Sequence, residues 1–232
     1  MIPSYADLEN RRNALATAEM LLDSGCVRFD TTMPFAAASG LESPLHVDIR
    51  GLLGFPDRRQ RLLRLALDEI ETEIQPRSLD AIACPTEGPG VAIATLLADR
   101  LCLPLLFVRR CPSCDPHKHD VEGRLEPGWR VLLVEQLATD GQRKAALVNT
   151  LNAAGAVVTD LFVVFQYGVY DAIHEHLAPL GVRTHALASW WDILEVVAAN
   201  PRLPPEALGS IRAFLHDPSS WHREPMPGRV PA

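Results

Sequence analysis

Apolar positions recur at two different spacings along the chain, and each spacing predicts a different kind of element. Spacings of three and four residues predict a helix over residues 4–24 and a second helix between Pro56 and Pro76. From residue 81 onward, short continuous apolar runs alternate with helical patterns. The runs cover residues 81–84, 105–108, 131–134 and 161–165, and the helical patterns cover 91–101 and 143–154. Continuous runs joined by helices predict a parallel sheet that is covered on both faces.

The rest of the chain adds shorter elements to this doubly wound α/β core. We expect helices over 171–177, 190–199 and 205–215, an edge strand over 184–187, and turns over 31–44. Residues 1–217 are expected to form a single domain, followed by a Pro-rich tail over 218–232 that frays. In such sheets, ligands bind at the carboxyl ends of the strands. Candidate chemistry is therefore sought in the loops that follow Cys84, Val108 and Glu135.

Composition and charge narrow the function classes. The 232 residues are 47% hydrophobic and 22% charged, which fits a globular chain with a real core. With 22 Lys and Arg against 29 Asp and Glu, the net charge is −7, so nucleic acid is not an expected partner. No apolar run is long enough to cross a bilayer and the start does not read as a secretion signal, so we expect no membrane contact and a cytoplasmic location. The five cysteines are an odd number and are expected to be reduced thiols.

The most informative segment is residues 131–144, which reads as a buried strand, a polar turn and the start of a helix. Backbone N–H groups at a helix N-terminus can hold a phosphate, and the Thr139 hydroxyl would add a donor. The alternative is an ordinary strand-to-helix loop in which Thr139 or Asp140 caps the helix. Glu135 and Asp140 place negative charge beside the proposed phosphate, which requires a cation or ribose hydroxyls to face these acids.

This segment resembles the phosphoribosyl-pyrophosphate (PRPP) motif of type I phosphoribosyltransferases. Over residues 15–221 the chain resembles the orotate phosphoribosyltransferases, whose motif is of the EDLTTDGGSK type. Further matches are Ser39-Gly40 with Ser43-Pro44, Asp48 and Arg50, then 105–109, Glu122-Gly123 and 188–192.

The resemblance implies a type I phosphoribosyltransferase fold with a small hood from residues 1–50, a core over about 57–188 and C-terminal helices over 189–216. It also implies Mg²⁺, a PRPP-like or nucleotide ligand, and a homodimer, because the family's mobile lid closes over the neighbouring subunit's site. The implied PRPP-binding residues are Glu135, Gln136, Thr139, Asp140, Gly141, Gln142 and Arg143. The implied pyrophosphate loop is Thr86, Glu87 and Gly88, the base-side residues are Ser39, Gly40 and Arg50, and the catalytic residues are Arg109 and Arg110.

Several positions depart from the family pattern in the direction that weakens PRPP chemistry. Gln136 replaces the second acid of the motif, and Gln142 and Arg143 replace small residues. The backbone can approach a phosphate closely only where the residues have little or no side chain, so we expect Gln142 to obstruct the site. Arg143 would supply positive charge from another direction.

The pyrophosphate side of the site departs as well. In the lid, Ser113 stands in the place of the catalytic lysine and Lys118 is the remaining lysine. Ala38 and Gly51 replace residues that are often polar or basic, and Glu87 adds an acid to the pyrophosphate loop. Losing cations near a developing pyrophosphate removes electrostatic stabilisation, so we expect weak or lost activity.

The lid also carries a group of potential zinc ligands. Cys111, Cys114, His117 and His119 form a C-x-x-C-x-x-H-x-H pattern, and zinc prefers thiolate and imidazole. The spacing is tighter than in zinc fingers, so one site would need a sharply folded loop, or a metal would bridge subunits. The alternative is an exposed polar loop with proline turns.

Three functions remain open on the sequence. The first is orotate phosphoribosyltransfer from PRPP, with weak activity. The second is a noncatalytic paralogue that binds a nucleotide or a protein partner in a regulatory role. The third is a phosphoribosyltransferase for another base, because residues 36–38 alter the region expected to meet orotate.

Overall fold

The computed structural model describes residues 5–36, 42–109, 120–168, 172–200, 203–218 and 220–221. Within them, the central sheet contains β5 (Ala81–Pro85), β6 (Leu105–Val108), β7 (Val121–Glu122), β8 (Arg130–Ala138), β9 (Val157–Gln166) and β10 (Arg183–Ser189). The strands lie in the order β10-β9-β8-β5-β6-β7, with β7 antiparallel to β6 and the other neighbours parallel. The chain moves from β5 outward to β6 and returns to β8 on the other side of β5. The strand order therefore reverses between β5 and β8.

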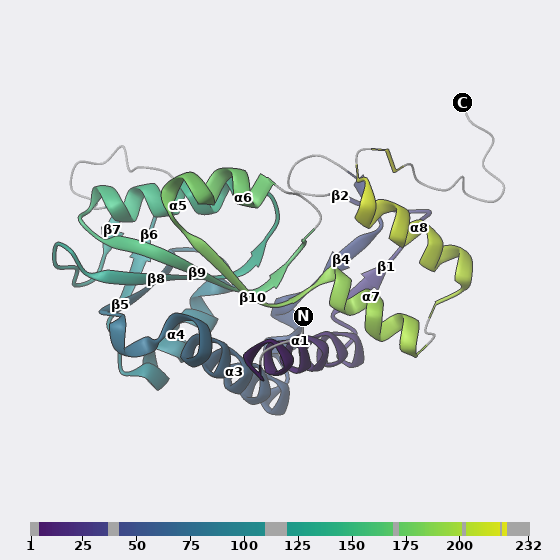
Figure 1. The fold of residues 1–232 in the computed structure, drawn as a ribbon, viewed down its shortest axis with the longest axis horizontal. Helices are drawn as coiled ribbons and strands as arrows, with labels where there is room; N and C mark the ends of the chain where they lie inside the picture. The colour runs from purple at the N-terminus through teal and green to yellow at the C-terminus, as the bar shows by residue number, and fades with distance from the viewer. Residues whose placement is uncertain are drawn as a thin grey trace.

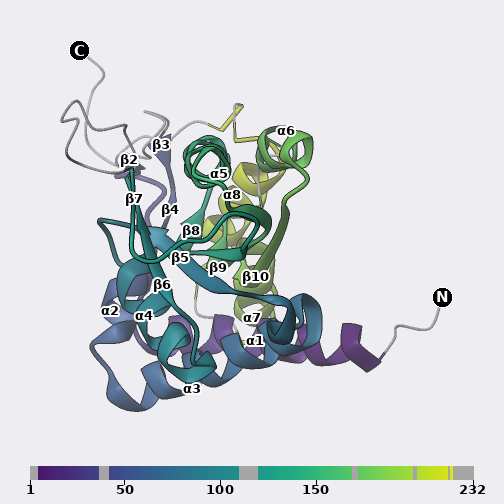
Figure 2. The ribbon, with the colours of Figure 1, turned by 90° about the vertical axis from the view of Figure 1, so that its left-hand side faces the viewer.

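Helices cover both faces of this sheet, which confirms the predicted doubly wound α/β class (Figure 1, Figure 2). The helices are α1 (Tyr5–Asp23), α3 (Pro56–Glu69), α4 (Gly90–Leu101), α5 (Gln142–Ala153) and α6 (Ala172–Leu177). On one face, α5 and α6 pack Leu147 and Ile173 against alternate strand residues such as Leu133. On the other face, α1, α3 and α4 pack against residues of opposite parity such as Leu132. The continuous apolar runs arise because both faces of each strand are buried.

The helix predicted between Pro56 and Pro76 is confirmed, with an irregular end. α3 continues into a π-helical turn, η1 (Ile70–Ile74), and a 3₁₀ turn, η2 (Pro76–Ser78), follows. Gln75 lies between them with a left-handed φ of 60°, which ends the helix before the strand β5. The buried side of this segment includes Leu63, Ala66 and Ile70, at the spacing that predicted the helix.

A group of short strands and one short helix, which we call the hood, precedes the core. It consists of β1 (Val27–Phe29), β2 (Phe35–Ala36), β3 (Glu42–Ser43), β4 (Leu45–Val47) and the short helix α2 (Ile49–Leu53). β1 pairs with β4 and β2 pairs with β3, both antiparallel. The sequence predicted turns over residues 31–44 and none of the four strands, because strands of two or three residues are too short to show alternation.

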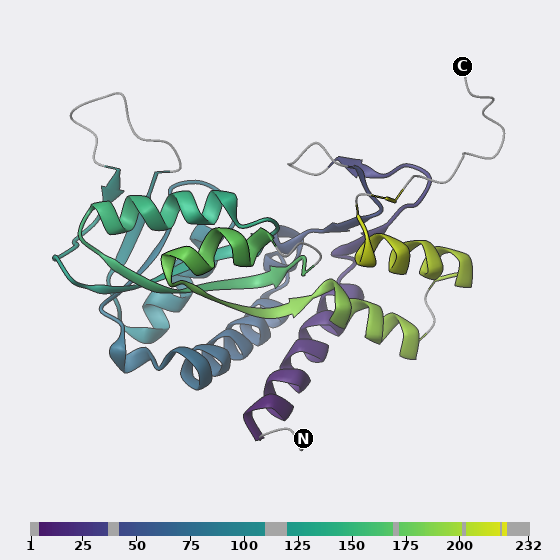
Figure 3. The same ribbon diagram turned by 45° about the horizontal axis from the view of Figure 1, so that its top comes forward.

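The C-terminal helices pack beside the hood, beyond the β10 side of the sheet (Figure 3). They are α7 (Trp190–Ala199) and α8 (Pro205–His216), after the 3₁₀ turn η3 (Ala178–Leu180) and β10. Ser189 and Asp192 form a capping box at the start of α7, which fixes its entry from β10. Of the expected tail over 218–232, Trp221 donates from its indole to the Ser210 hydroxyl at 3.1 Å, and residues 222–232 lie outside the described residues.

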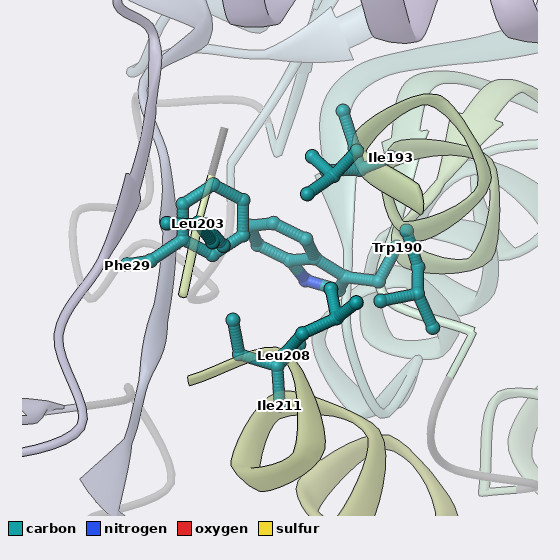
Figure 4. A pocket seen from close by; sticks show the side chains of 8 residues that line it. Phe29, Trp190, Ile193, Leu203, Leu208 and Ile211 are labelled. Atoms are coloured by element: carbon teal, nitrogen blue, oxygen red, sulfur yellow. The ribbon is translucent and has the colours of Figure 1, made fainter. Parts of the chain in front are cut away.

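A small apolar pocket lies between β1, α7 and α8 (Figure 4). Trp190 is buried there against Phe29, and its indole N–H has no hydrogen-bond partner within the described structure. None of the described helices is both long and apolar enough to span a membrane.

Candidate active site

Three loops emerge at the same edge of the sheet, at the carboxyl ends of β5, β8 and β6. The parallel register pairs Pro85 with Val108, so the chain leaves β5 and β6 at neighbouring points. β8 pairs with β5 up to Leu133 and extends further in the same direction, to Ala138. We name residues 86–89 the pyrophosphate loop, 139–141 the phosphate loop and 109–120 the lid. The fold thus brings together, beside the reversal point of the sheet, the regions that the sequence singled out.

The phosphate loop is shaped by Gly141, which precedes the first residue of α5 in a left-handed conformation with a φ of 84°. A β-carbon at this position would lie 3.0 Å from the Cα of Ile173 in α6, so backbone angle and space both require glycine. Asp140 Oδ1 accepts a hydrogen bond from the Gln142 N–H at 3.2 Å, but the N-cap residue of α5 is Gly141 and has no side-chain cap, so neither Thr139 nor Asp140 is the cap that the alternative predicted. The Gln142 side chain is exposed to solvent, and so is that of Arg143.

Glu135 lies near the carboxyl end of β8 and is only 2% exposed. Its Oε1 atom lies 2.9 Å from Nζ of Lys144, in the first turn of α5, which is 9% exposed. A β-carbon on Gly90, the first residue of α4, would lie 3.0 Å from the other carboxylate oxygen. Burial, with the charge of Glu135 added, raises the pKa of the neighbouring Cys84 thiol to about 12, so this cysteine stays protonated. The first acid of the motif is thus a buried, ion-paired group, and Gln136 beside it is partly exposed.

The pyrophosphate loop connects β5 to α4. Its first residue, Thr86, donates its backbone N–H to the Val108 carbonyl at 3.0 Å, which ties the loop to β6. Gly88 has a φ of 104°, and both Glu87 and Gly88 are exposed. The loop is therefore anchored at its start and open to solvent at its tip, where an anionic ligand would approach Glu87.

The two ends of the lid are held together by β7. The Arg109 N–H donates to the Asp120 carbonyl at 2.8 Å, and the Arg109 guanidinium forms an ion pair with Glu122. One of the two predicted catalytic arginines is thus paired with an acid at the far end of its own loop. Arg110, Cys111, Ser113, Cys114, His117, Lys118 and His119 lie outside the described residues, and with them the predicted zinc ligands. Elsewhere in the described chain, no group of three His, Cys, Asp or Glu side chains is arranged to hold a metal.

On the base side, Arg50 is exposed in α2, while Ser39 and Gly40 lie outside the described residues. Asp48 caps α2 by accepting from the Gly51 N–H at 3.0 Å. A β-carbon on Gly51 would lie 2.9 Å from the Asp48 carboxylate, so a larger side chain at this position would displace the cap.

The hood also presents a cationic and aromatic cluster that sequence reasoning missed. Arg28 and His46 are partners in the β1–β4 pair, and Phe35 belongs to the β2–β3 pair. The centre of the Phe35 ring lies 5.4 Å from the Arg28 guanidinium and 5.2 Å from the centre of the His46 ring. Burial, and secondly the charge of Arg28, lower the pKa of His46, so its ring tends to be neutral. The alternation of Arg28 and Phe29 in a longer strand would have indicated which side chain is exposed, but β1 is too short to show it.

Comparison with known proteins identifies the family. A search of protein-family models gives no match, but the chain is 38% identical to the orotate phosphoribosyltransferase of Dinoroseobacter shibae over 222 residues, which is 95% of this chain and 97% of that protein. Among solved structures, the orotate phosphoribosyltransferase of Aeropyrum pernix matches with a TM-score of 0.65 and 29% identity, over 78% of this chain and 99% of that one. The UMP synthase of Leishmania donovani matches with a TM-score of 0.71 and 26% identity, over 87% of this chain and 42% of that longer one. The fold is thus that of the type I phosphoribosyltransferases, and the chain belongs to the orotate phosphoribosyltransferase family.

Proposed function

We propose that the chain transfers the phosphoribosyl group of PRPP to orotate, giving orotidine 5′-monophosphate and pyrophosphate in pyrimidine nucleotide synthesis, with weak turnover. The observation that carries the proposal is the phosphate loop, in which a left-handed Gly141 opens α5 beside the point where the strand order reverses. Backbone N–H groups at such a helix start attract phosphate, and ligands of doubly wound sheets bind at that point. The names of the relatives supply the reaction and the base.

In this reaction the bond between ribose C1′ and the pyrophosphate oxygen breaks, and C1′ forms a bond to a ring nitrogen of orotate. The start of α5 would hold the 5′-phosphate, and Gln136 and Thr139 would lie beside the ribose hydroxyls. The pyrophosphate loop and the lid arginines would take the leaving group, because positive charge and N–H donors stabilise the charge that develops there. The proposed residues are Thr86, Glu87 and Gly88 for the loop, Arg109 and Arg110 for the lid, Gly141, Gln142 and Arg143 for the phosphate, and Ser39, Gly40 and Arg50 for the base.

The weak turnover follows from what these residues lack. Ser113 cannot supply the charge of a lysine at the pyrophosphate, and Arg109 is already paired with Glu122. One lost donor of this kind costs on the order of 3 kcal/mol in the transition state, or about a hundredfold in rate. Glu135 is buried and Gln136 is partly exposed, so of these two motif residues Gln136 is the one that would meet the ribose.

Mg²⁺ fits this site as a metal that enters with its substrate. The described residues offer no cage of three ligands, and the Glu135 carboxylate is engaged by Lys144. Mg²⁺ commonly keeps several waters and binds through substrate phosphates with one or two carboxylates. Asp140 is the partly exposed carboxylate of the phosphate loop. When bound, the metal would neutralise charge on the pyrophosphate.

The test combines PRPP binding with turnover. Purified protein is titrated with PRPP and Mg²⁺ by calorimetry, and the loss of orotate absorbance is followed in the same samples. We expect binding with slow turnover, and we expect Ser113→Lys together with Gln136→Asp to raise the rate about tenfold or more. Binding without turnover in both proteins would indicate the noncatalytic paralogue, and turnover with a different base alone would indicate the third function.

We also propose a homodimer, because the family's lid closes over the neighbouring subunit's site. Light scattering gives the mass of the protein in solution, and mixing two variants with complementary defects, one in the lid and one in the phosphate loop, tests whether the sites are shared. Recovery of activity in the mixture supports the shared site, while a monomeric active enzyme contradicts it.

A further inference from the structure

The chain contains only two lysines against twenty arginines, and Lys144 is one of the two. It is also buried, with 9% of its surface exposed. Taking an ammonium group out of water costs free energy unless a charged partner lies close. The partner here is the Glu135 carboxylate at 2.9 Å, itself 2% exposed. The compact ammonium group of lysine, at the end of a flexible side chain, suits this buried position better than the larger, planar guanidinium group of arginine.

The position of this ion pair relates it to two loops at once. Lys144 follows the phosphate loop by three residues and belongs to the first turn of α5. Gly90 follows the pyrophosphate loop directly and is the first residue of α4. Because Glu135 contacts both Lys144 and the backbone at Gly90, one carboxylate bridges the helix starts that carry the two loops.

The close fit at Gly90 makes this bridge stiff. A β-carbon on Gly90 would lie 3.0 Å from Glu135 Oε2 and 3.3 Å from Glu135 Cα, so the start of α4 rests directly on this residue of β8. A side chain larger than glycine at position 90 would therefore push against Glu135 and disturb its contact with Lys144. Densely packed interiors transmit such shifts to their neighbours.

We propose that Lys144 is a positioning residue: acting through Glu135, it fixes the separation of the phosphate loop and the pyrophosphate loop. This separation sets which ligand fits, namely one that carries a phosphate group at each end of a ribose. The inference rests on the proposed function, in which PRPP is that ligand. Lys144 itself does not need to touch PRPP.

Ligands differ in whether they reach the phosphate loop, the pyrophosphate loop or both. PRPP reaches both loops, whereas ribose 5-phosphate reaches only the phosphate loop and pyrophosphate only the pyrophosphate loop. If the ion pair sets the separation, its loss weakens PRPP binding and leaves the two fragments nearly unchanged. If the pair only stabilises the fold, its loss affects all three ligands alike.

The experiment measures the dissociation constants of the three ligands, with Mg²⁺, by calorimetry. The proteins are wild type, Lys144→Met, Glu135→Gln, and the double variant. We expect Lys144→Met to weaken PRPP binding about tenfold or more, because displacements of about 1 Å cost up to a hundredfold, and to change fragment binding less than about threefold. In the Glu135→Gln background, Lys144→Met should have little further effect, since a residue that acts through another shows non-additive changes.

The ratio of PRPP affinity to fragment affinity is the readout that a purely structural role would not move, because a general loss of stability weakens the binding of all three ligands alike. If Lys144→Met does not fold, Gly90→Ala tests the same contact from the other side and should also weaken PRPP binding selectively.

The matched control is Arg183→Met. Arg183 Nη2 lies 2.9 Å from the buried carboxylate of Asp160, which is 1% exposed, at the opposite end of the parallel strands β9 and β10. This variant should lower stability without changing the ratio of PRPP to fragment affinity.

Two outcomes separate the inference from the proposed function. Equal losses for all three ligands in Lys144→Met, or an undiminished effect in the Glu135→Gln background, would overturn the inference alone. A wild-type chain that binds none of the three ligands would overturn the proposed function and the inference with it.

Discussion

Glu69 provides a test of the packing between α3 and the rest of the body. This glutamate is the last residue of α3 and is only 8% exposed. Burial, and secondly the charge of Glu73 one turn later, raise its pKa from 4.5 to about 7. Glu73 in turn accepts a hydrogen bond from Asn10 of α1 at 2.8 Å. We predict that Glu69→Gln stabilises the protein at alkaline pH.

The sign follows from the proton balance. Since the pKa of Glu69 is higher in the folded state, its contribution to stability is fully present below about pH 4.5 and is lost as pH rises toward 7. The pKa rises by 7 − 4.5 = 2.5, and a change of one in pKa is worth about 1.36 kcal/mol. Ionised Glu69 therefore destabilises the folded state by about 3 kcal/mol. Glutamine has nearly the same shape and never ionises, so the variant should gain about this amount at pH 8 and almost nothing at pH 4.

Urea unfolding of wild type and Glu69→Gln at half-unit steps from pH 4 to pH 8 measures this difference. The free energy of unfolding should diverge between the two proteins from about pH 5 upward and level off near pH 7.5. Glu71→Gln, on the exposed side of the same turn, is the matched control and should give a constant small difference. A variant that is no more stable than wild type at pH 8 would show that Glu69 is not desolvated and would refute the reasoning.

Three further predictions concern the loops. Gly141→Ala should lower the free energy of unfolding by about 2 kcal/mol or more and abolish PRPP binding, because a β-carbon there would clash with Ile173 and because a φ of 84° is unfavourable for alanine. Urea unfolding measures the stability and calorimetry measures the binding, and a stable variant with intact binding contradicts this prediction. Glu122→Gln should remove the ion pair between Glu122 and Arg109 and strengthen pyrophosphate binding about two- to fivefold, since a surface ion pair contributes up to about 1 kcal/mol. Unchanged or weaker binding by calorimetry contradicts this prediction. Elemental analysis of protein purified without chelator should find one zinc per lid if the Cys and His residues of 111–119 bind it, and less than about a tenth of an equivalent refutes that prediction.

The sequence predicted the core well because its strands are buried on both faces. The apolar run at 131–134 lies in the first half of β8, which extends over Arg130–Ala138, and the run at 161–165 lies in the second half of β9. The polar residues at the ends of these strands, such as Glu135, cannot be told from loop residues by the hydrophobic pattern of the sequence. Their place in the sheet comes from pairing with neighbours, which one chain's pattern does not show.

The short strands of the hood and the edge strand β7 were missed for a related reason. β7 has two residues, and its place is fixed by pairing of Val121 with Val108 and by the bond from Arg109 to Asp120. Such contacts span the lid and leave no local periodicity. Strands of this length therefore become visible only in the folded chain.

The local structure around the candidate site was predicted, but not its geometry. The strand, the turn and the helix start over residues 131–144 follow from the sequence pattern and are confirmed, whereas the left-handed φ of Gly141 appears only in the structure. The pairing of Glu135 with Lys144 did not follow, because it depends on how far the first turn of α5 lies from β8. An acid and a lysine nine residues apart give no signal in sequence, although both lie in the segment that the motif covers.

The most direct test of the account is the fate of orotate in the presence of PRPP. Wild-type protein, PRPP, Mg²⁺ and orotate are mixed, and the loss of orotate absorbance is compared with the pyrophosphate released. The account predicts slow, Mg²⁺-dependent loss of orotate with one pyrophosphate released for each orotate consumed. Orotate that persists in full while PRPP is bound, at protein concentrations comparable to those of the substrates, would contradict it.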